Sequence, residues 1–189
     1  MILITGGAGY IGSHTCVELL ANGEELIVID NLSNSSFESL NRVKKISGKA
    51  ITFVEGDIRD KLLLRSIFTK YTIKSVVHFA GLKALGESIG HPLKYYDNNV
   101  SGSISLIEVM AEFSCKVMVF SSSATVYGEP ASVPITEDFP LKTTNPYGAS
   151  KLMIEQILGD LVLADAEWSI ALLRYFNPVG AHDSGLIGE

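Results

Sequence analysis

The hydrophobic positions of the chain fall into six short, mostly apolar runs, separated by longer stretches of mixed polarity. Short runs that stay apolar instead of alternating with polar residues are typical of strands buried on both faces of a parallel sheet. We therefore predict six strands, at Ile2–Ile4, Leu26–Ile29, Ile51–Val54, Ser75–Phe79, Val117–Phe120 and Ser169–Leu173.

The stretches between these runs carry apolar residues at helical spacing. They predict helices at Ser13–Ala21, Lys61–Lys70, Leu93–Phe113 and Pro146–Ala164. Strands that alternate with helices specify an α/β fold, a doubly wound parallel sheet of the Rossmann type. Ligands of such sheets bind beyond the carboxyl ends of the strands, and the unusual polar and glycine residues of this chain cluster there.

The first strand runs into a glycine-rich turn, with Gly6, Gly9 and Gly12 at a spacing of three. Gly7, Gly9 and Gly12 also match a G-x-G-x-x-G pattern. Glycine lets the backbone turn tightly and approach a ligand, and the first amides of the following helix point at negative charge. A strand-to-helix turn without a ligand is the alternative. The context favours a pyrophosphate site.

The second strand ends in Asp30, eighteen residues after Gly12. A carboxylate at about this spacing accepts hydrogen bonds from both hydroxyls of an adenosine ribose and repels a 2′-phosphate. The next arginine is Arg42. The sequence therefore predicts NAD, rather than NADP, as the cofactor.

Composition narrows the class of protein further. At 189 residues with 47% hydrophobic residues, the chain is long enough for one domain with a sizeable core. A net charge of −6 without a basic cluster argues against nucleic acid, and the apolar runs are too short to span a membrane. We expect a cytoplasmic protein with two buried thiols, Cys16 and Cys115, and no metal site, since the four histidines are scattered.

The start of the last helix carries a candidate catalytic pair, Tyr147 and Lys151. Asn145 is a good N-cap and Pro146 suits the first helical position, so the pair lies four residues apart on one helix face. A free tyrosine ionises near pH ~10, and a neighbouring ammonium is expected to lower that pKa toward the range of a general base. A core tyrosine with a solvated lysine is the alternative reading.

Ser121–Ser123 follow the fifth strand, and we expect one of these hydroxyls to assist Tyr147; Ser123, with Thr125 beside it, is the candidate we select. A polar loop is the alternative. Asp60 fits a helix cap, which leaves Asp57 free for the adenine edge. Lys83 is either a solvated lysine or a counter-charge for the pyrophosphate.

Together these motifs resemble the extended short-chain dehydrogenases/reductases that act on nucleotide sugars, the NAD-dependent epimerase/dehydratase family, and within it the 4-epimerases. The resemblance covers the whole chain. It rests on the glycine turn, Tyr147 with Lys151, the Ser121–Gly128 loop, and the stretches Gly12–Thr15, Phe53–Asp57, His78–Ala84, Tyr95–Asn99 and Leu173–Gly180.

The resemblance implies the remaining site residues. It places the sugar near Ser123, Tyr147 and Asn177. It implies cofactor contacts from Gly6, Gly9, Tyr10, Ile11, Gly12, Asp30, Asn31, Leu32, Ser33, Asn34, Ser35, Asp57, Ile58, Phe79, Ala80, Gly81, Leu82, Lys83, Asn98, Tyr147, Lys151 and Phe176.

The activity implied is the interconversion of UDP-galactose and UDP-glucose, by hydride transfer at the sugar C4 through a 4-keto intermediate. Other nucleotide-sugar epimerases of the family and a non-catalytic NAD-binding module are the alternatives. We expect a homodimer through the helices after Pro92 and Pro146, because their apolar residues spread beyond one stripe. Residues 1–177 would form the NAD-binding domain and 178–189 the start of a substrate domain. Because family members continue beyond Glu189, we expect this chain alone to be inactive.

Overall fold

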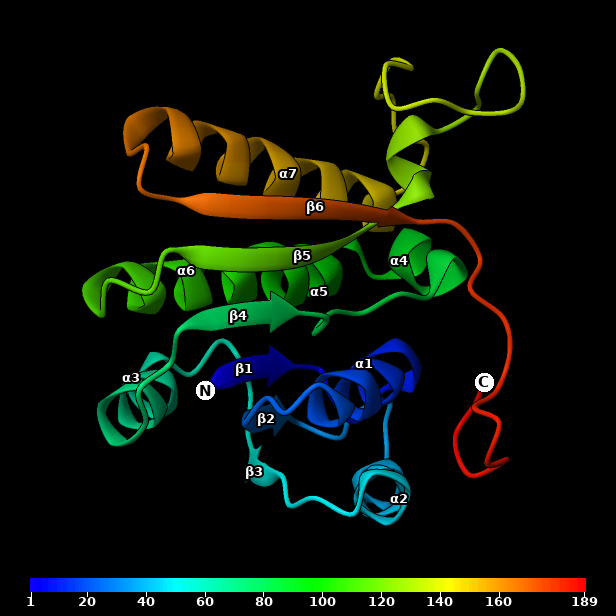
Figure 1. The fold of residues 1–189 in the computed structure, drawn as a ribbon. Helices are drawn as coiled ribbons and strands as arrows, with labels where there is room; N and C mark the ends of the chain where they lie inside the picture. Colours follow the sequence, from blue (N-terminus) through cyan, green and yellow to red (C-terminus); the bar gives the residue numbers. More distant parts are fainter.

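The computed structural model describes residues 1–189 as a six-stranded sheet in the order β3-β2-β1-β4-β5-β6, with helices on both faces (Figure 1). Every strand pair is parallel. The predicted doubly wound Rossmann-type fold is therefore confirmed. The strands are β1 (Ile2–Thr5), β2 (Leu26–Asp30), β3 (Thr52–Glu55), β4 (Ser75–His78), β5 (Val117–Ser123) and β6 (Ser169–Tyr175).

Helices connect the strands, and several begin at side-chain caps. Ser36, Asp60 and Asn145 each accept hydrogen bonds from backbone amides of the first turn that follows. The α-helices are α1 (Tyr10–Ala21), α2 (Phe37–Ser47), α3 (Lys61–Lys70), α4 (Leu85–Gly90), α5 (Pro92–Tyr95), α6 (Gly102–Glu112) and α7 (Pro146–Ala164). A π-helix, η1 (Tyr96–Ser101), joins α5 to α6, and a 3₁₀ turn, η2 (Ala124–Tyr127), follows β5.

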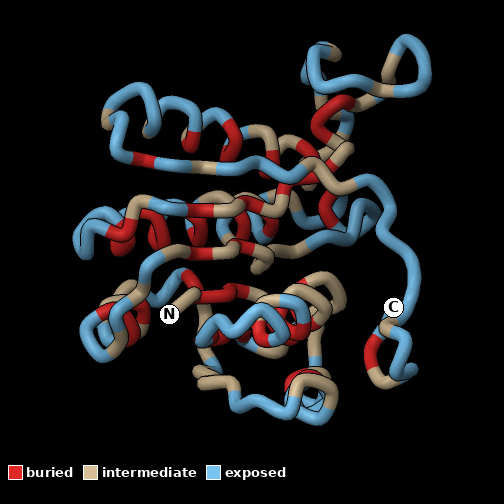
Figure 2. Tube along the Cα trace, in the orientation of Figure 1, coloured by how far each residue is buried: buried red, intermediate tan, exposed pale blue.

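Alternate residues of the central strands supply two separate cores. Leu3 and Ile27 pack with α3, α6 and α7 on one face, whereas Ile4 and Val28 pack with α1 and α2 on the other. Figure 2 shows the buried residues along the inner strands and the sheet-facing sides of the helices. β6 lies at the edge of the sheet, and its residues are largely exposed.

Three local features differ from the sequence prediction. α2 and α4 were not anticipated; α2 buries Leu40 and Val43 on one apolar stripe, and α4 buries only Ser88. The single helix expected at Leu93–Phe113 is instead α5, η1 and α6 in succession. β5 continues to Ser123, because it pairs with β6 along its whole length, so the serines belong to the strand.

The residues after β6 run past the carboxyl ends of the strands toward α1 and α2 (Figure 1). Tyr10 Oη donates to Gly180 O at 3.0 Å, and Arg42 Nη1 donates to Leu186 O at 3.0 Å. Ile187 is buried in the second core. The domain boundary at residue 177 stays a prediction. No helix is both long and apolar enough to cross a lipid bilayer.

Candidate cofactor and active site

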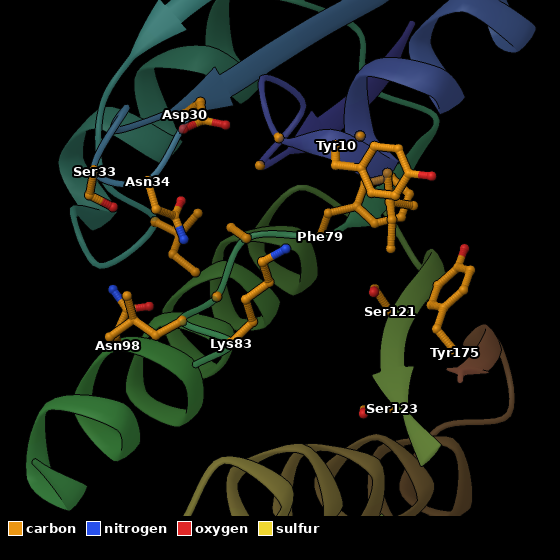
Figure 3. Close-up of a pocket in the computed structure, with 18 of the residues that line it drawn as sticks. Tyr10, Asp30, Ser33, Asn34, Phe79, Lys83, Asn98, Ser121, Ser123 and Tyr175 are labelled. Atoms are coloured by element: carbon orange, nitrogen blue, oxygen red, sulfur yellow. The ribbon is translucent and has the colours of Figure 1, made fainter. Parts of the chain in front are cut away.

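A cavity of about 310 Å³ opens at the carboxyl ends of the strands. Asp30 and Ser33 lie on one side of it and Ser121 and Ser123 on the other (Figure 3). The structure brings all the predicted site residues to this cavity except Leu32, Ser35 and Asn177. The binding roles of all the predicted residues stay predictions. Ser121 and Ser122, the other two serines considered beside Ser123, also line it. Residues that line it without having been predicted are Ile29, Gly56, Tyr175, Pro178 and Glu189.

The glycine turn leaves no room for side chains between β1 and α1. Gly6 has a φ of 70°, and a Cβ there would lie 2.6 Å from Ala80 N. A Cβ on Gly12 would lie 2.4 Å from Gly6 O. No side chain caps the N-terminus of α1, and its first residues line the cavity. The turn therefore presents free helix amides to the cavity, as an anion site requires.

Asp30 is buried at the end of β2 with its carboxylate held in place. It accepts hydrogen bonds from Ala8 N at 3.0 Å, Leu32 N at 3.0 Å and Ser35 Oγ at 2.8 Å. Leu32 and Ser35 thus orient Asp30 instead of lining the cavity themselves. A carboxylate oxygen accepts two hydrogen bonds, and Oδ1 already accepts from Leu32 N and Ser35 Oγ, so Asp30 Oδ2 can accept one further hydrogen bond from a ribose hydroxyl.

Asp57 lines the cavity with its carboxylate already hydrogen-bonded within the protein, and its contact with the adenine edge stays a prediction. Arg59 donates to this carboxylate from Nε at 2.9 Å and Nη2 at 2.8 Å, and Asn31 Nδ2 donates at 3.0 Å. The hydrogen bonds from Arg59 lower the pKa of Asp57 to about 2. Lys83 is mostly exposed at the mouth of the cavity, 3.5 Å from Glu189 Oε1.

Lys151 is buried on the first turns of α7. Asn145 Oδ1 accepts from Gly148 N at 2.8 Å and Pro146 is the first helical residue, as predicted. The Lys151 ammonium donates to Ser121 O at 2.8 Å and lies 4.8 Å from the centroid of the Phe120 ring. Burial lowers the pKa of Lys151 to about 8, and the nearby charge of Glu155 opposes that shift.

The expected lowering of the Tyr147 pKa is wrong for this structure. Burial raises the pKa of Tyr147, and only the Ser123 hydroxyl acts in the opposite direction. Lys151 does not contribute, because its ammonium is directed at the Ser121 carbonyl. Ser123 Oγ accepts from Thr125 Oγ1 at 3.0 Å, as the predicted adjacency of the two hydroxyls requires.

A buried polar network beside the cavity joins β1, β4, η1, α6 and α7. Thr5 Oγ1 lies 2.6 Å from His78 Nδ1, and His78 Nε2 lies 2.8 Å from Ser103 Oγ. Ser103 donates to Asn99 O, and Asn99 Nδ2 donates to Ser150 Oγ at 3.0 Å. Since the single Ser103 proton goes to Asn99, His78 carries its proton on Nε2 and accepts at Nδ1.

The residues present suit a dinucleotide. The cavity offers free helix amides at one end, an oriented carboxylate for a ribose diol, and a hydroxyl, a phenol and an ammonium at the other end. No group of three or more His, Cys, Asp or Glu side chains could hold a metal ion.

The family model for the NAD dependent epimerase/dehydratase family matches residues 2–188, and the chain belongs to this family. The resemblance read from the sequence is thereby confirmed. Its relatives include the UDP-glucose 4-epimerases of Bacillus subtilis, 65% identical over 188 residues, and of Dictyostelium discoideum, 58% identical over 188 residues. The chain spans 56% and 55% of the lengths of these curated relatives, and each comparison covers 100% of the chain.

Solved structures give the same result. The UDP-glucose 4-epimerase of Bifidobacterium longum in complex with NAD+ and UDP is 54% identical, with a TM-score of 0.98 over 100% of this chain and 56% of that one. The enzyme of Brucella ovis in complex with NAD is 39% identical, with a TM-score of 0.91 over 100% of this chain and 55% of that one. Both of these enzymes are in complex with NAD, the cofactor that the sequence predicts.

Proposed function

We propose that this chain is the NAD-binding and catalytic part of an enzyme that interconverts UDP-galactose and UDP-glucose. One observation carries the proposal. Tyr147, Lys151 and Ser123 line the same cavity as the glycine turn and Asp30, so a dinucleotide held at the turn and Asp30 extends toward them. The identity with UDP-glucose 4-epimerases supports this substrate over other nucleotide sugars.

In this proposal the chain's own residues bind the cofactor and move one proton. The amides of α1 hold the pyrophosphate, Asp30 accepts from the adenosine ribose, and Lys151 donates to the second ribose. NAD bound there supplies the hydride acceptor for the sugar C4. Tyr147 accepts the proton of the sugar 4-hydroxyl, while Ser123 hydrogen-bonds the same oxygen.

To accept this proton, Tyr147 must be ionised, and its raised pKa opposes ionisation. Lys151 retains a positive charge near neutral pH, since its pKa is about 8. Release of Lys151 from the Ser121 carbonyl to a ribose hydroxyl would bring that charge toward the phenol. The segment Ser121–Tyr127 contains no acidic residue that could serve as an extra acid for dehydration, which favours epimerisation.

We also propose a homodimer through the outer faces of α5, α6 and α7. Apolar side chains remain exposed on these helices, with Leu93 at 82% and Leu163 at 86%. Met153 and Ile104 are also exposed. Side chains of this kind on neighbouring helices are typical of a surface that a second copy covers.

The chain is expected to bind NAD without useful turnover by itself. After Lys151 the only lysine or arginine is Arg174, and its guanidinium is already bound to Glu155 and Tyr127. A uridine diphosphate normally needs several charge-assisted donors. The chain therefore offers too few cations for the substrate diphosphate.

Two measurements test this proposal. Calorimetry on the 189-residue chain should detect NAD binding that Asp30→Ala weakens. A chimera, in which this chain replaces the aligned segment of the Bacillus subtilis relative, should epimerise UDP-galactose in a coupled assay. Absence of NAD binding, or an inactive chimera that is folded and dimeric, would refute the proposal. Turnover of about 1–10³ s⁻¹ by the chain alone would refute its dependence on further substrate contacts.

A further inference from the structure

Four side chains from four elements form one buried cluster beside the proposed active site. Arg174 of β6 donates to Glu155 of α7 from Nη2 at 2.7 Å and from Nε at 3.1 and 3.2 Å. Its Nη1 donates to Tyr127 Oη of η2 at 2.8 Å. Ser122 Oγ of β5 donates to Glu155 Oε1. The Glu155 side chain is only 4% exposed.

A buried ion pair of this kind contributes little net free energy to folding. Burying two charges costs desolvation that their attraction offsets only with good geometry, and apolar replacements are often no less stable. What the pair provides is a fixed geometry, because removing one partner leaves the other charge buried and alone. The geometry that it fixes here is that of Ser122 and Tyr127 relative to α7.

Ser122 lies between the two residues of β5 that act on Lys151 and Tyr147. Ser121 O, one residue before Ser122, accepts the Lys151 ammonium. Ser123, one residue after it, acts on Tyr147. Glu155 lies one helical turn beyond Lys151 on the same helix face. One carboxylate is therefore placed to hold the segment Ser121–Tyr127 and to face the Lys151 charge.

We propose that Glu155, neutralised by Arg174, is a positioning residue for the active site: it fixes Ser122, and thereby Ser121 and Ser123, relative to Lys151 and Tyr147. The part of this inference that concerns catalysis rests on the proposed function. The positioning of Lys151 and Ser123 does not, and it can be measured without NAD.

The titration midpoint of Lys151 is a quantity that a change in packing alone would not shift, because it depends on the charges around the ammonium. The groups that act on its ammonium are His78 from β4, the Phe120 ring from β5 and Glu155 from α7. His78 is neutral near pH 7, because burial lowers its pKa to about 3. Glu155 is thus the one negative charge that favours the charged form of Lys151, and its removal should lower the Lys151 pKa further.

The test uses three variants of the 189-residue chain. Glu155→Gln with Arg174→Met removes both charges together, so that no buried charge is left unpaired. Ser122→Ala removes one hydroxyl and leaves the ion pair in place. Glu112→Gln is the matched control, because it breaks the surface pair between Arg65 and Glu112, which has two hydrogen bonds of 2.7 Å.

The titration midpoint of Lys151 is measured by ¹³C NMR of lysine-labelled protein and assigned with Lys151→Arg. In the double variant we expect it to fall by about 0.3–0.5 pH unit, a two- to threefold change in the ammonium population, because loss of the Arg174 charge offsets part of the loss of the Glu155 charge. In Ser122→Ala the Thr125 amide, which donates to Ser123 Oγ at 3.2 Å, should exchange with solvent faster. NAD affinity should fall about tenfold in both variants, and the control should match the parent chain.

Each outcome either supports or overturns the positioning role of Glu155. A folded double variant with an unchanged Lys151 midpoint would overturn the proposal, as would unchanged Thr125 exchange in Ser122→Ala. If the double variant fails to fold, Ser122→Ala alone decides. Failure of the parent chain to bind NAD would count against the proposed function only, since the Lys151 and Thr125 readouts need no ligand.

Discussion

Acidification should destabilise this protein through His78. The folded chain keeps this imidazole neutral, because burial lowers its pKa from 6.5 to about 3. The unfolded chain takes up the proton below about pH 6.5 and the folded chain does so only near pH 3, so protonation favours the unfolded state between these values. Stability should fall as the pH drops through this window and lose its dependence on His78 below it.

The size of the effect follows from the width of the window. From about pH 6.5 to 4.5 only the unfolded chain takes up the His78 proton. The free energy of unfolding falls by about 1.4 kcal/mol for each of these two pH units, or about 3 kcal/mol in all. That is a large part of the roughly 5–15 kcal/mol that stabilises a typical domain. Asp57, whose pKa is about 2, loses its contribution mainly at lower pH, as it falls from 3.8 toward 2.

The assay is urea unfolding followed by circular dichroism at about pH 7 and 4.5, with His78→Gln as the variant. A glutamine side chain keeps one acceptor and one donor but cannot take up a proton. The loss of unfolding free energy between the two pH values should be about 3 kcal/mol smaller in the variant. His91→Gln, at an exposed position, is the control. Equal pH dependence of the parent and His78→Gln would refute the argument.

Four further predictions concern the site and assembly. The chain should bind NAD more tightly than NADP, because the Asp30 carboxylate repels a 2′-phosphate; calorimetry showing equal or stronger NADP binding would contradict this. Tyr147→Phe in the active chimera should cost about 10²–10⁴-fold in turnover with NAD still bound, and near-normal turnover would assign the base elsewhere. Gly12→Ala should abolish NAD binding, since the new Cβ would lie 2.4 Å from Gly6 O; retained affinity in calorimetry would show that the turn can relax. Light scattering at micromolar concentration should give a dimer that Leu93→Asp weakens, whereas a monomeric parent chain would exclude this interface.

The sequence was sufficient for features that depend on short-range patterns. Apolar runs located all six strands, and the caps at Asp60 and Asn145 follow from residue type and position alone. The glycine turn and Asp30 were recognisable because their functions depend on fixed spacing within one βαβ unit. α2 was missed although its apolar residues Phe37, Leu40, Val43 and Ile46 lie at helical spacing and Ser36 caps it, so its pattern was available in the sequence.

What the sequence could not give are contacts between polar residues far apart in the chain. Nothing in the spacing pairs Glu155 with Arg174, or Arg59 with Asp97, because these pairs depend on how helices and strands are placed. The same limit explains the error on Tyr147. A spacing of four residues predicts that Lys151 can approach it, but the Ser121 carbonyl, contributed by another strand, is the partner of Lys151.

The sheet order also determines when the cofactor cavity can exist during synthesis. β1 is made first, yet it is an inner strand: Ile2 pairs with Leu26 on one side and with Ser75 on the other. A nascent chain can therefore assemble β1, β2 and β3 before β4 has been synthesised. Until then one edge of β1 is unpaired, and an unpaired edge is prone to wrong pairing. Both half-sheets contribute walls to the cavity, so NAD binding should appear only after they have docked, which makes it a marker for completed folding.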